Sequence, residues 1–193
     1  MTRALDMAGG WLKRGRPVFA AFRDARGVSA IEFALIAPVL LVLYVGAVEI
    51  GNVLTIDRRV GLVGSTAADL VAQKKTTSDS ELNDVGNAAK SILTPYSTSP
   101  LKIVLTSVVA DQNNNGKVAW SYASNGGTPR AKNSPYTVPP GLTQANSSVI
   151  LAEVTYDFSP LLNLSGLPNP GFFKMSHTFY ARPRKSLQVA KSD

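Results

Sequence analysis

One stretch of the sequence places a carboxylate at the start of a long apolar run. Glu32 follows Arg26 and Gly27 in RGVSAIEFALIAPVLLVLYVGAVEIG, and the 16 residues from Phe33 to Val48 carry no charge. A charged side chain at the centre of a bilayer costs roughly 2.5–3.5 kcal/mol on insertion scales, so an acidic residue in such a segment needs a partner or a function. The chemistry open to Glu32 is ion pairing with a cation on its own helix or on a neighbouring helix.

The other reactive side chains form no recognisable catalytic or metal-binding set. His177 is the only histidine and lies in a strand-like run with no carboxylate nearby, so we expect a structural role for it. Asp111 precedes Asn-Asn-Asn-Gly, which lacks the alternating carboxylates and the closing glutamate of a calcium loop and predicts a turn. The serines show no nucleophile-elbow spacing, and the chain has no cysteine for disulfides or thiolate metal sites. We therefore expect no enzyme, no catalytic residue, no metal and no cofactor.

The positive charge of the chain is concentrated near its beginning. The net charge is +7, and residues 1–27 hold six bases against two acids. A basic head directly before an apolar run is typical of a membrane segment whose positive flank stays in the cytoplasm, and Arg26 is the last base of that flank. The remainder holds 14 bases and 11 acids and shows no dense basic and aromatic face, so we expect no nucleic acid partner.

A single long helix is expected to carry these residues. The uncharged run spans about 24 Å as a helix, and extension through Ile56 makes it long enough to cross a bilayer with Glu32 and Glu49 near the two interfaces. Pro38 lies inside the run and is expected to kink or loosen the helix. From Ile56 onward apolar residues recur every three or four positions, which is an amphipathic pattern. The helix is therefore predicted to end near residues 73–75.

The second part of the chain predicts a small α+β domain. Ser78 and Glu81 have the spacing of a capping box, which predicts a short helix ending near Leu93. Four segments rich in branched and aromatic residues follow, and the first two flank a turn-forming cluster, which indicates a hairpin. These strand candidates are residues 101–110, 117–124, 147–158 and 172–184. The predicted fold class is α+β, with the long N-terminal helix packed on a small antiparallel sheet.

Several motifs resemble a known family. RG followed by VSAIEF resembles the class III signal of type IV prepilins, in which a glycine precedes the cut and a glutamate is fifth in the mature chain. With Val28 as the first mature residue, Glu32 is fifth and Phe33 is sixth. More narrowly, this stretch, the AADLVAQ that follows, and the distal VTYDFSPLL and ARPR resemble the TadE-like minor pilins, or pseudopilins, of tight-adherence (Flp) pilus systems.

The resemblance implies a pilin-like fold and a precursor that a prepilin-type peptidase cuts between Gly27 and Val28. Residues 1–27 would be a cytoplasmic leader, residues 28–75 the membrane-spanning and amphipathic helix, and residues 76–193 a periplasmic domain. The protein would be a single-pass bacterial inner-membrane protein that serves as a minor subunit or assembly factor of an adhesive pilus. Its partners would be the peptidase, other pilin and pseudopilin subunits, the pilus assembly platform and the lipid bilayer.

Cleavage would supply the partner that Glu32 needs. The new ammonium on Val28 has an unperturbed pKa of about 8 and is mostly charged at neutral pH. Glu32 lies one helical turn further on the same face, or within reach of a neighbouring subunit's ammonium. Both charges are costly in an apolar medium unless they pair, so pairing would favour side-by-side helices in a set axial stagger. Gly27 would be needed because the peptidase must accommodate extended backbone at the cut.

Two alternatives without this cleavage remain open. An ordinary secretory signal could end at the small residues VGA, and release after Ala47 would give a soluble periplasmic binding module. An uncleaved chain would be a bitopic anchor that presents an interaction domain to a secretion complex. The long head and the lack of a helix break after Ala47 argue against the first alternative. Replacement of Glu32 by alanine should impair assembly in the pilin interpretation and be nearly silent in both alternatives.

Overall fold

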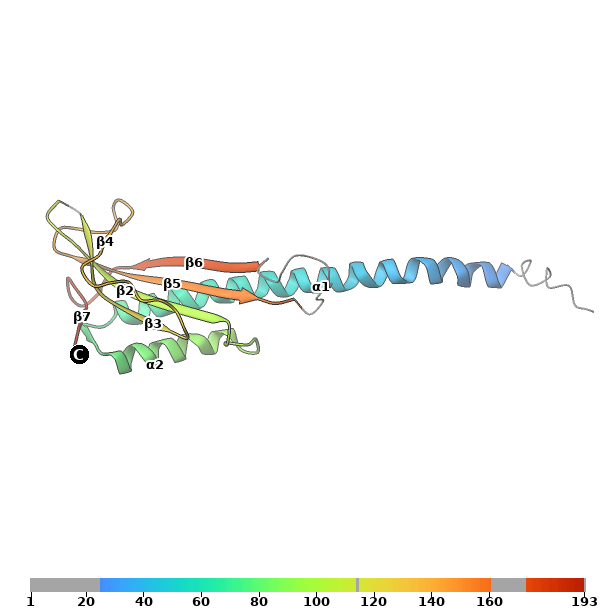
Figure 1. Ribbon diagram of the computed structural model, residues 1–193, viewed down its shortest axis with the longest axis horizontal. Helices are drawn as coiled ribbons and strands as arrows, with labels where there is room; N and C mark the ends of the chain where they lie inside the picture. The colour runs from blue at the N-terminus through green and yellow to red at the C-terminus, as the bar shows by residue number, and fades with distance from the viewer. Residues whose placement is uncertain (1–24, 114, 161–172, 193) are drawn as a thin grey trace, which may run out of the picture. The chain divides into compact units, whose positions relative to one another are not determined.

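The computed structural model describes residues 25–113, 115–160 and 173–192, and their contacts divide the chain into two compact units, Met1–Ala47 and Val48–Asp193. The helical elements are α1 (Ala25–Ala72), α2 (Asp79–Lys90) and the short 3-10 helix η2 (Ser91–Leu93). The strands are β1 (Thr76–Thr77), β2 (Leu101–Ala110), β3 (Gly116–Ser124), β4 (Pro135–Tyr136), β5 (Ser148–Phe158), β6 (Phe173–Ala181) and β7 (Ala190–Lys191) (Figure 1).

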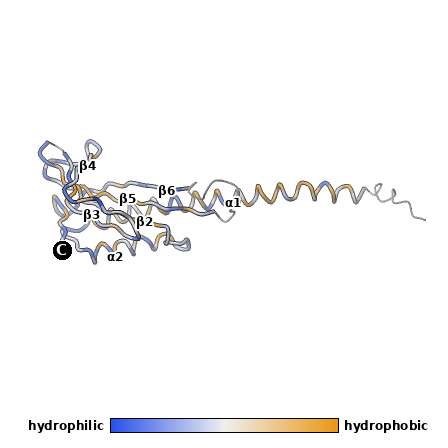
Figure 2. The backbone as a smooth tube through the Cα atoms, viewed as in Figure 1, coloured by the Kyte–Doolittle hydropathy of each residue, from blue (hydrophilic) through white to orange (hydrophobic). Residues whose placement is uncertain are grey.

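The first half of α1 consists mainly of apolar residues, as the predominantly orange tube in Figure 2 shows. By length and composition the described chain has one helix able to cross a membrane, Gly27–Ala72, and none of its most apolar window is buried. A helix that is hydrophobic on every side requires an apolar environment around it. Because its large side chains lie exposed within the first unit, this half of α1 is consistent with membrane anchoring.

The second half of α1 is part of the hydrophobic core of the second unit. Its buried side chains recur at helical spacing, as the amphipathic pattern predicted, and they are Ile56, Val60, Val63, Ala67 and Val71. They pack with apolar side chains of α2 and of the sheet in one cluster. The compact unit therefore begins at Val48, within α1, and the helix ends at Ala72, close to the predicted end.

The main sheet is antiparallel, with the strand order β4-β3-β2-β5-β6 (Figure 1). The predicted hairpin is present as β2 and β3, with a register irregularity between Ser107 and Val108. Alternate residues of a strand face opposite sides of a sheet. On β5, Ile150, Ala152 and Val154 therefore face α1 and α2, on what we term the inner face of the sheet. The α+β class with the long helix packed on an antiparallel sheet is confirmed.

A smaller cluster covers part of the opposite face, which we term the outer face. Val149 belongs to this cluster together with Val108, Val118 and Val138. The segment that contains Val138 lies outside the four predicted strands. It also contributes β4, which pairs with the beginning of β3. A strand of two residues has no periodicity that sequence analysis could detect.

The last described residues close the second unit. β7 pairs in parallel with β1, which directly follows α1 in the chain. The buried side chain of Val189 joins the main core, and the Trp120 indole N–H donates a hydrogen bond of 2.8 Å to the Val189 carbonyl. This C-terminal segment was not predicted as a strand, and β6 ends at Ala181 rather than at residue 184.

The predicted capping box at the start of α2 is also present. The Ser78 hydroxyl accepts a hydrogen bond from the Glu81 amide, and the Ser78 amide donates to the Glu81 carboxylate at 3.1 Å. The hydrogen bond from Lys74 contributes most to lowering the pKa of Glu81, followed by the bond from the Ser78 amide. Two N–H groups at the helix start are thereby satisfied.

We expect Ser78→Ala to lower the free energy of unfolding by about 1 kcal/mol, because it removes the side-chain cap. The measurement is urea unfolding of the full chain in detergent micelles, followed by Trp120 fluorescence in a Trp11→Phe background. Ser80→Ala is the matched control, since Ser80 is exposed in the first turn of the same helix and is not the cap. Equal losses in the two variants would contradict a specific capping role.

Candidate functional site

The predicted cleavage site lies near the beginning of α1. Gly27 and Val28 are both helical and exposed, and Val28 keeps 47% of its surface accessible. A Cβ atom built on Gly27 would meet no atom within 4 Å. Packing within the described chain therefore does not require glycine here, and any such requirement has to come from a partner that binds this segment. The backbone of Arg26 lies in the same turn, and its side chain is outside the described parts.

Glu32 and Phe33 occupy the next turn of α1. Both side chains are exposed, Phe33 to 67%. Among the residues that the structure describes, no cation pairs with Glu32. Positions 28 and 32 are four residues apart in an unbroken helix and so lie on one face, as expected. The two predicted pairing positions therefore share one face of α1, on an apolar surface that suits a lipid bilayer.

Pro38 lies inside α1, which is α-helical on both sides of it. Proline removes one backbone donor from the helix, and membrane helices tolerate this when other groups satisfy the freed carbonyl. The local loosening that we expect at Pro38 stays a prediction.

Two polar side-chain contacts connect α1 with the later part of the chain, and neither was predicted. His177 Nε2 lies 2.8 Å from Asp57 Oδ1, although the two residues are 120 positions apart. The expectation that His177 has no carboxylate nearby was wrong, because β6 packs beside α1. The Arg184 guanidinium pairs with Asp69. Both pairs are partly exposed, so each contributes at most about 1 kcal/mol to stability.

A sequence signal for these pairs existed on one side only. Asp57 and Asp69 lie between the apolar positions that form the stripe of α1, so the amphipathic pattern places each of them next to a packed surface. The spacing of residues could not show that the segment with their partners, His177 and Arg184, lies beside α1. Asp69 and Arg184 both lie in motifs that carry the family resemblance, AADLVAQ and ARPR.

Comparison with known proteins bears on this helix directly. The model of the family described as TadE-like protein matches residues 27–69. This chain is TadE-like over that segment. The match begins at Gly27 and therefore includes the predicted cleavage site, Glu32 and most of α1. We found no match among curated proteins or solved structures. The TadE-like segment supports association with the tight-adherence pilus system.

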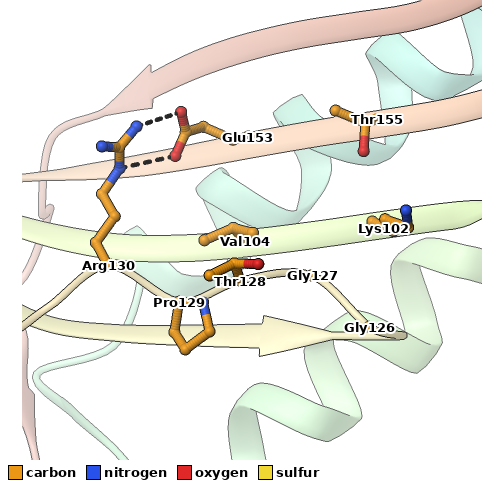
Figure 3. Close-up of a pocket in the computed structure, with 9 residues that line it drawn as sticks. All are labelled: Lys102, Val104, Gly126, Gly127, Thr128, Pro129, Arg130, Glu153 and Thr155. Atoms are coloured by element: carbon orange, nitrogen blue, oxygen red, sulfur yellow. Dashed lines mark hydrogen bonds and ion pairs between the residues drawn. The ribbon is translucent and has the colours of Figure 1, made fainter.

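A groove described by the structure lies outside the TadE-like segment. It measures about 480 Å³ and is on the outer face of the sheet, between β2, β5 and residues 126–130 (Figure 3). Arg130 donates two hydrogen bonds to Glu153, from Nε at 3.0 Å and from Nη2 at 2.6 Å. These bonds raise the pKa of Arg130. Its guanidinium also lies 4.8 Å from the centroid of the Tyr136 ring.

This groove offers little chemistry. Burial raises the pKa of Tyr136 well above its usual range, and its hydroxyl bonds to that of Tyr180 at 3.0 Å. The described lining of the groove contains no histidine or serine. Among the described residues no group of three or more histidine or acidic side chains could hold a metal.

Proposed function

We propose that this chain is the precursor of a minor pilin or pseudopilin that contributes to the biogenesis of a tight-adherence (Flp) pilus. A prepilin-type peptidase cuts it between Gly27 and Val28, and the mature protein acts as a subunit or assembly factor rather than as an enzyme. One observation carries the proposal. Glu32 lies one turn from Val28 on an exposed apolar helix, and no described cation neutralises its carboxylate.

An unpaired Glu32 carboxylate is energetically unfavourable in a bilayer. Pairing with the ammonium of Val28 removes this penalty and thereby favours assembly. In water an exposed pair of this kind is worth little, but in an apolar medium each unpaired charge is expensive. The ammonium of the same chain or of a neighbouring chain can neutralise Glu32. The intermolecular pair forms only when two α1 helices lie side by side and Val28 of one helix is at the same height as Glu32 of the other. Pairing therefore selects one axial offset between the two helices.

The neighbouring residues support the same process. Arg26 keeps the basic head in the cytoplasm before cleavage. Phe33, with two thirds of its side chain exposed, offers an apolar contact to an adjacent helix beside the ion pair. Pro38 provides a position at which α1 can lose regular hydrogen bonds during assembly.

The proposed topology is a single pass through the bacterial inner membrane, with the N-terminus in the cytoplasm and the α+β domain in the periplasm. The proposed partners are the prepilin-type peptidase, other pilin and pseudopilin subunits, the assembly platform and the bilayer. The TadE-like match and the one membrane-compatible helix support this arrangement.

The first test is the N-terminal residue of the mature protein, determined by intact mass in cells with and without the candidate peptidase. We expect a start at Val28 that disappears without the peptidase. A start at Val48 would instead indicate an ordinary secretory signal, and an intact Met1 end would indicate an uncleaved anchor. Either of those results contradicts the proposal.

A matched pair of glycine variants makes the test specific. Gly27→Val should block cleavage while leaving the fold intact, because a side chain there meets nothing in the described chain. Gly46→Val is the control, since Gly46 is equally uncrowded and lies in the same helix. Normal cleavage of the Gly27 variant would exclude the proposed processing site.

A further inference from the structure

A second groove lies between two segments that are far apart in the sequence. One wall is Ala119–Ser121 of β3, and the other is Gln188–Lys191 at the end of the chain. The groove measures about 410 Å³. It lies outside residues 27–69, and the proposed processing and pairing of α1 make no use of it.

The outer edge of β3 is only partly covered. β4 pairs with Gly116 and Lys117, and two further backbone hydrogen bonds reach Val118. Beyond Val118, no strand of the described chain pairs with this edge. Such an edge presents backbone N–H and C=O groups that an added extended segment can bind.

The opposite wall is held in place. Val189 is 2% exposed, and its carbonyl accepts the hydrogen bond from the Trp120 indole at 2.8 Å. Ala190 is the β-bridge partner of Thr76. Because these contacts already order the wall, binding of a ligand in the groove does not include the loss of conformational entropy that ordering this segment would require.

The charged side chains that line the groove are all cations. They are Arg130, Lys132 and Lys191, and no carboxylate is in the described lining. Arg130 pairs with Glu153 and Lys191 with Asp79, and neither of these acids lines the groove. Lys132 is exposed and forms no ion pair within the described residues. The lining therefore favours acidic side chains over basic ones.

We infer that this groove binds a short extended peptide segment of a partner protein that carries aspartate or glutamate side chains. The peptide backbone adds to the free edge of β3 next to Ala119–Ser121, and its carboxylates contact Lys132 and the other two cations. The backbone bonds supply most of the affinity, and the cations supply the preference for an acidic sequence.

The test uses the full chain in phosphatidylcholine nanodiscs, with Trp11→Phe so that Trp120 in the groove is the remaining tryptophan. The probe is an acetylated, amidated hexaglutamate peptide, and binding is followed by Trp120 fluorescence and by calorimetry. We expect saturable binding that Lys132→Glu weakens roughly tenfold. Lys117→Glu is the control, because Lys117 is an exposed lysine of β3 outside the groove lining, and it should change binding less than twofold.

Two further probes separate strand addition from simple anion binding. Hexaglutamate with N-methylated backbone keeps its charge but loses its N–H donors, so we expect it to bind at least tenfold more weakly. Tripolyphosphate should not displace the unmodified peptide at equal concentration. Absence of hexaglutamate binding, equal binding of the N-methylated peptide, displacement by tripolyphosphate, or an unaltered affinity of the folded Lys132→Glu variant would each overturn the inference. Because none of these measurements depends on cleavage at Gly27, failure here leaves the proposed function untouched.

Discussion

Glu32→Gln is expected to lower the amount of the mature protein in assembled pili at least tenfold while cleavage after Gly27 continues. Glutamine keeps the size of the side chain but removes the charge, so the ammonium of Val28 loses its partner in an apolar environment. Removal of one member of a buried ion pair typically costs about 3–5 kcal/mol, which exceeds the 1.4 kcal/mol that corresponds to a factor of ten. The measurement is quantitative blotting of the sheared pilus fraction and of the membrane fraction.

Glu49→Gln is the control for this result. It makes the same chemical change at the other end of the apolar run, where the proposal assigns no assembly role. We expect a reduction of less than twofold. An equal loss in the two variants would point to a general requirement for charge at the ends of the membrane segment. Loss of cleavage in the Glu32 variant would assign the residue to recognition by the peptidase instead of to pairing.

The second large effect is expected at the contact between α1 and the sheet. A Cβ atom on Gly64 would lie 2.7 Å from Phe179 Cδ2 and 2.9 Å from Val154 Cγ2. Such crowding typically costs about 1–3 kcal/mol, against which alanine gains about 1 kcal/mol of helix propensity over glycine. In Gly64→Ala we therefore expect a net loss of up to about 2 kcal/mol in the free energy of unfolding, measured by urea titration in detergent micelles.

Gly61→Ala provides the matched control one turn earlier in α1. A Cβ atom there would lie 3.7 Å from Phe179 Cζ, which is an ordinary contact. Alanine then gains helix propensity over glycine without steric crowding, so this variant should be more stable than the wild type by up to about 1 kcal/mol. The two variants should thus shift the urea midpoint in opposite directions.

Removing the crowded neighbour tests the steric explanation itself. Phe179→Leu in the Gly64→Ala background frees space at the ring atoms that the new methyl group meets. The double variant should lose less stability than the sum of the two single variants, since neighbouring substitutions couple. The steric explanation would be wrong if the losses in the free energy of unfolding simply added, or if Gly64→Ala were more stable than the wild type. Either result would show that β6 can move away from α1 without loss of stability.

Most of the secondary structure could be predicted from the spacing of residue types within short stretches of the sequence. The apolar stripe from Ile56 to Val71 predicted the second half of α1, and the Ser78–Glu81 spacing predicted the cap of α2. The turn-forming cluster after Ala110 predicted the hairpin of β2 and β3. Each signal is contained in fewer than about 20 residues, and in each case the local preference agrees with the final packing.

The candidate processing and pairing residues were also accessible from the sequence, because Gly27, Val28 and Glu32 lie close together in the chain and form one recognisable motif. The structure added one fact that spacing could not provide. A Cβ atom at Gly27 would meet no atom of the described residues within 4 Å, so packing among those residues does not explain this glycine, and its explanation has to be sought in a partner.

The sequence by itself determined a membrane-compatible helix, a TadE-like motif and an α+β domain. Only the tertiary structure decided which distant residues meet: Asp57 with His177, Asp69 with Arg184, and the final strand β7 with β1. These contacts join positions more than 100 residues apart, and two-residue strands carry no periodic signal. They form because burial of the stripe of α1 against the sheet brings β6 and the C-terminal segment alongside the helix. That burial depends on the shape and packing of the complete core rather than on any local pattern.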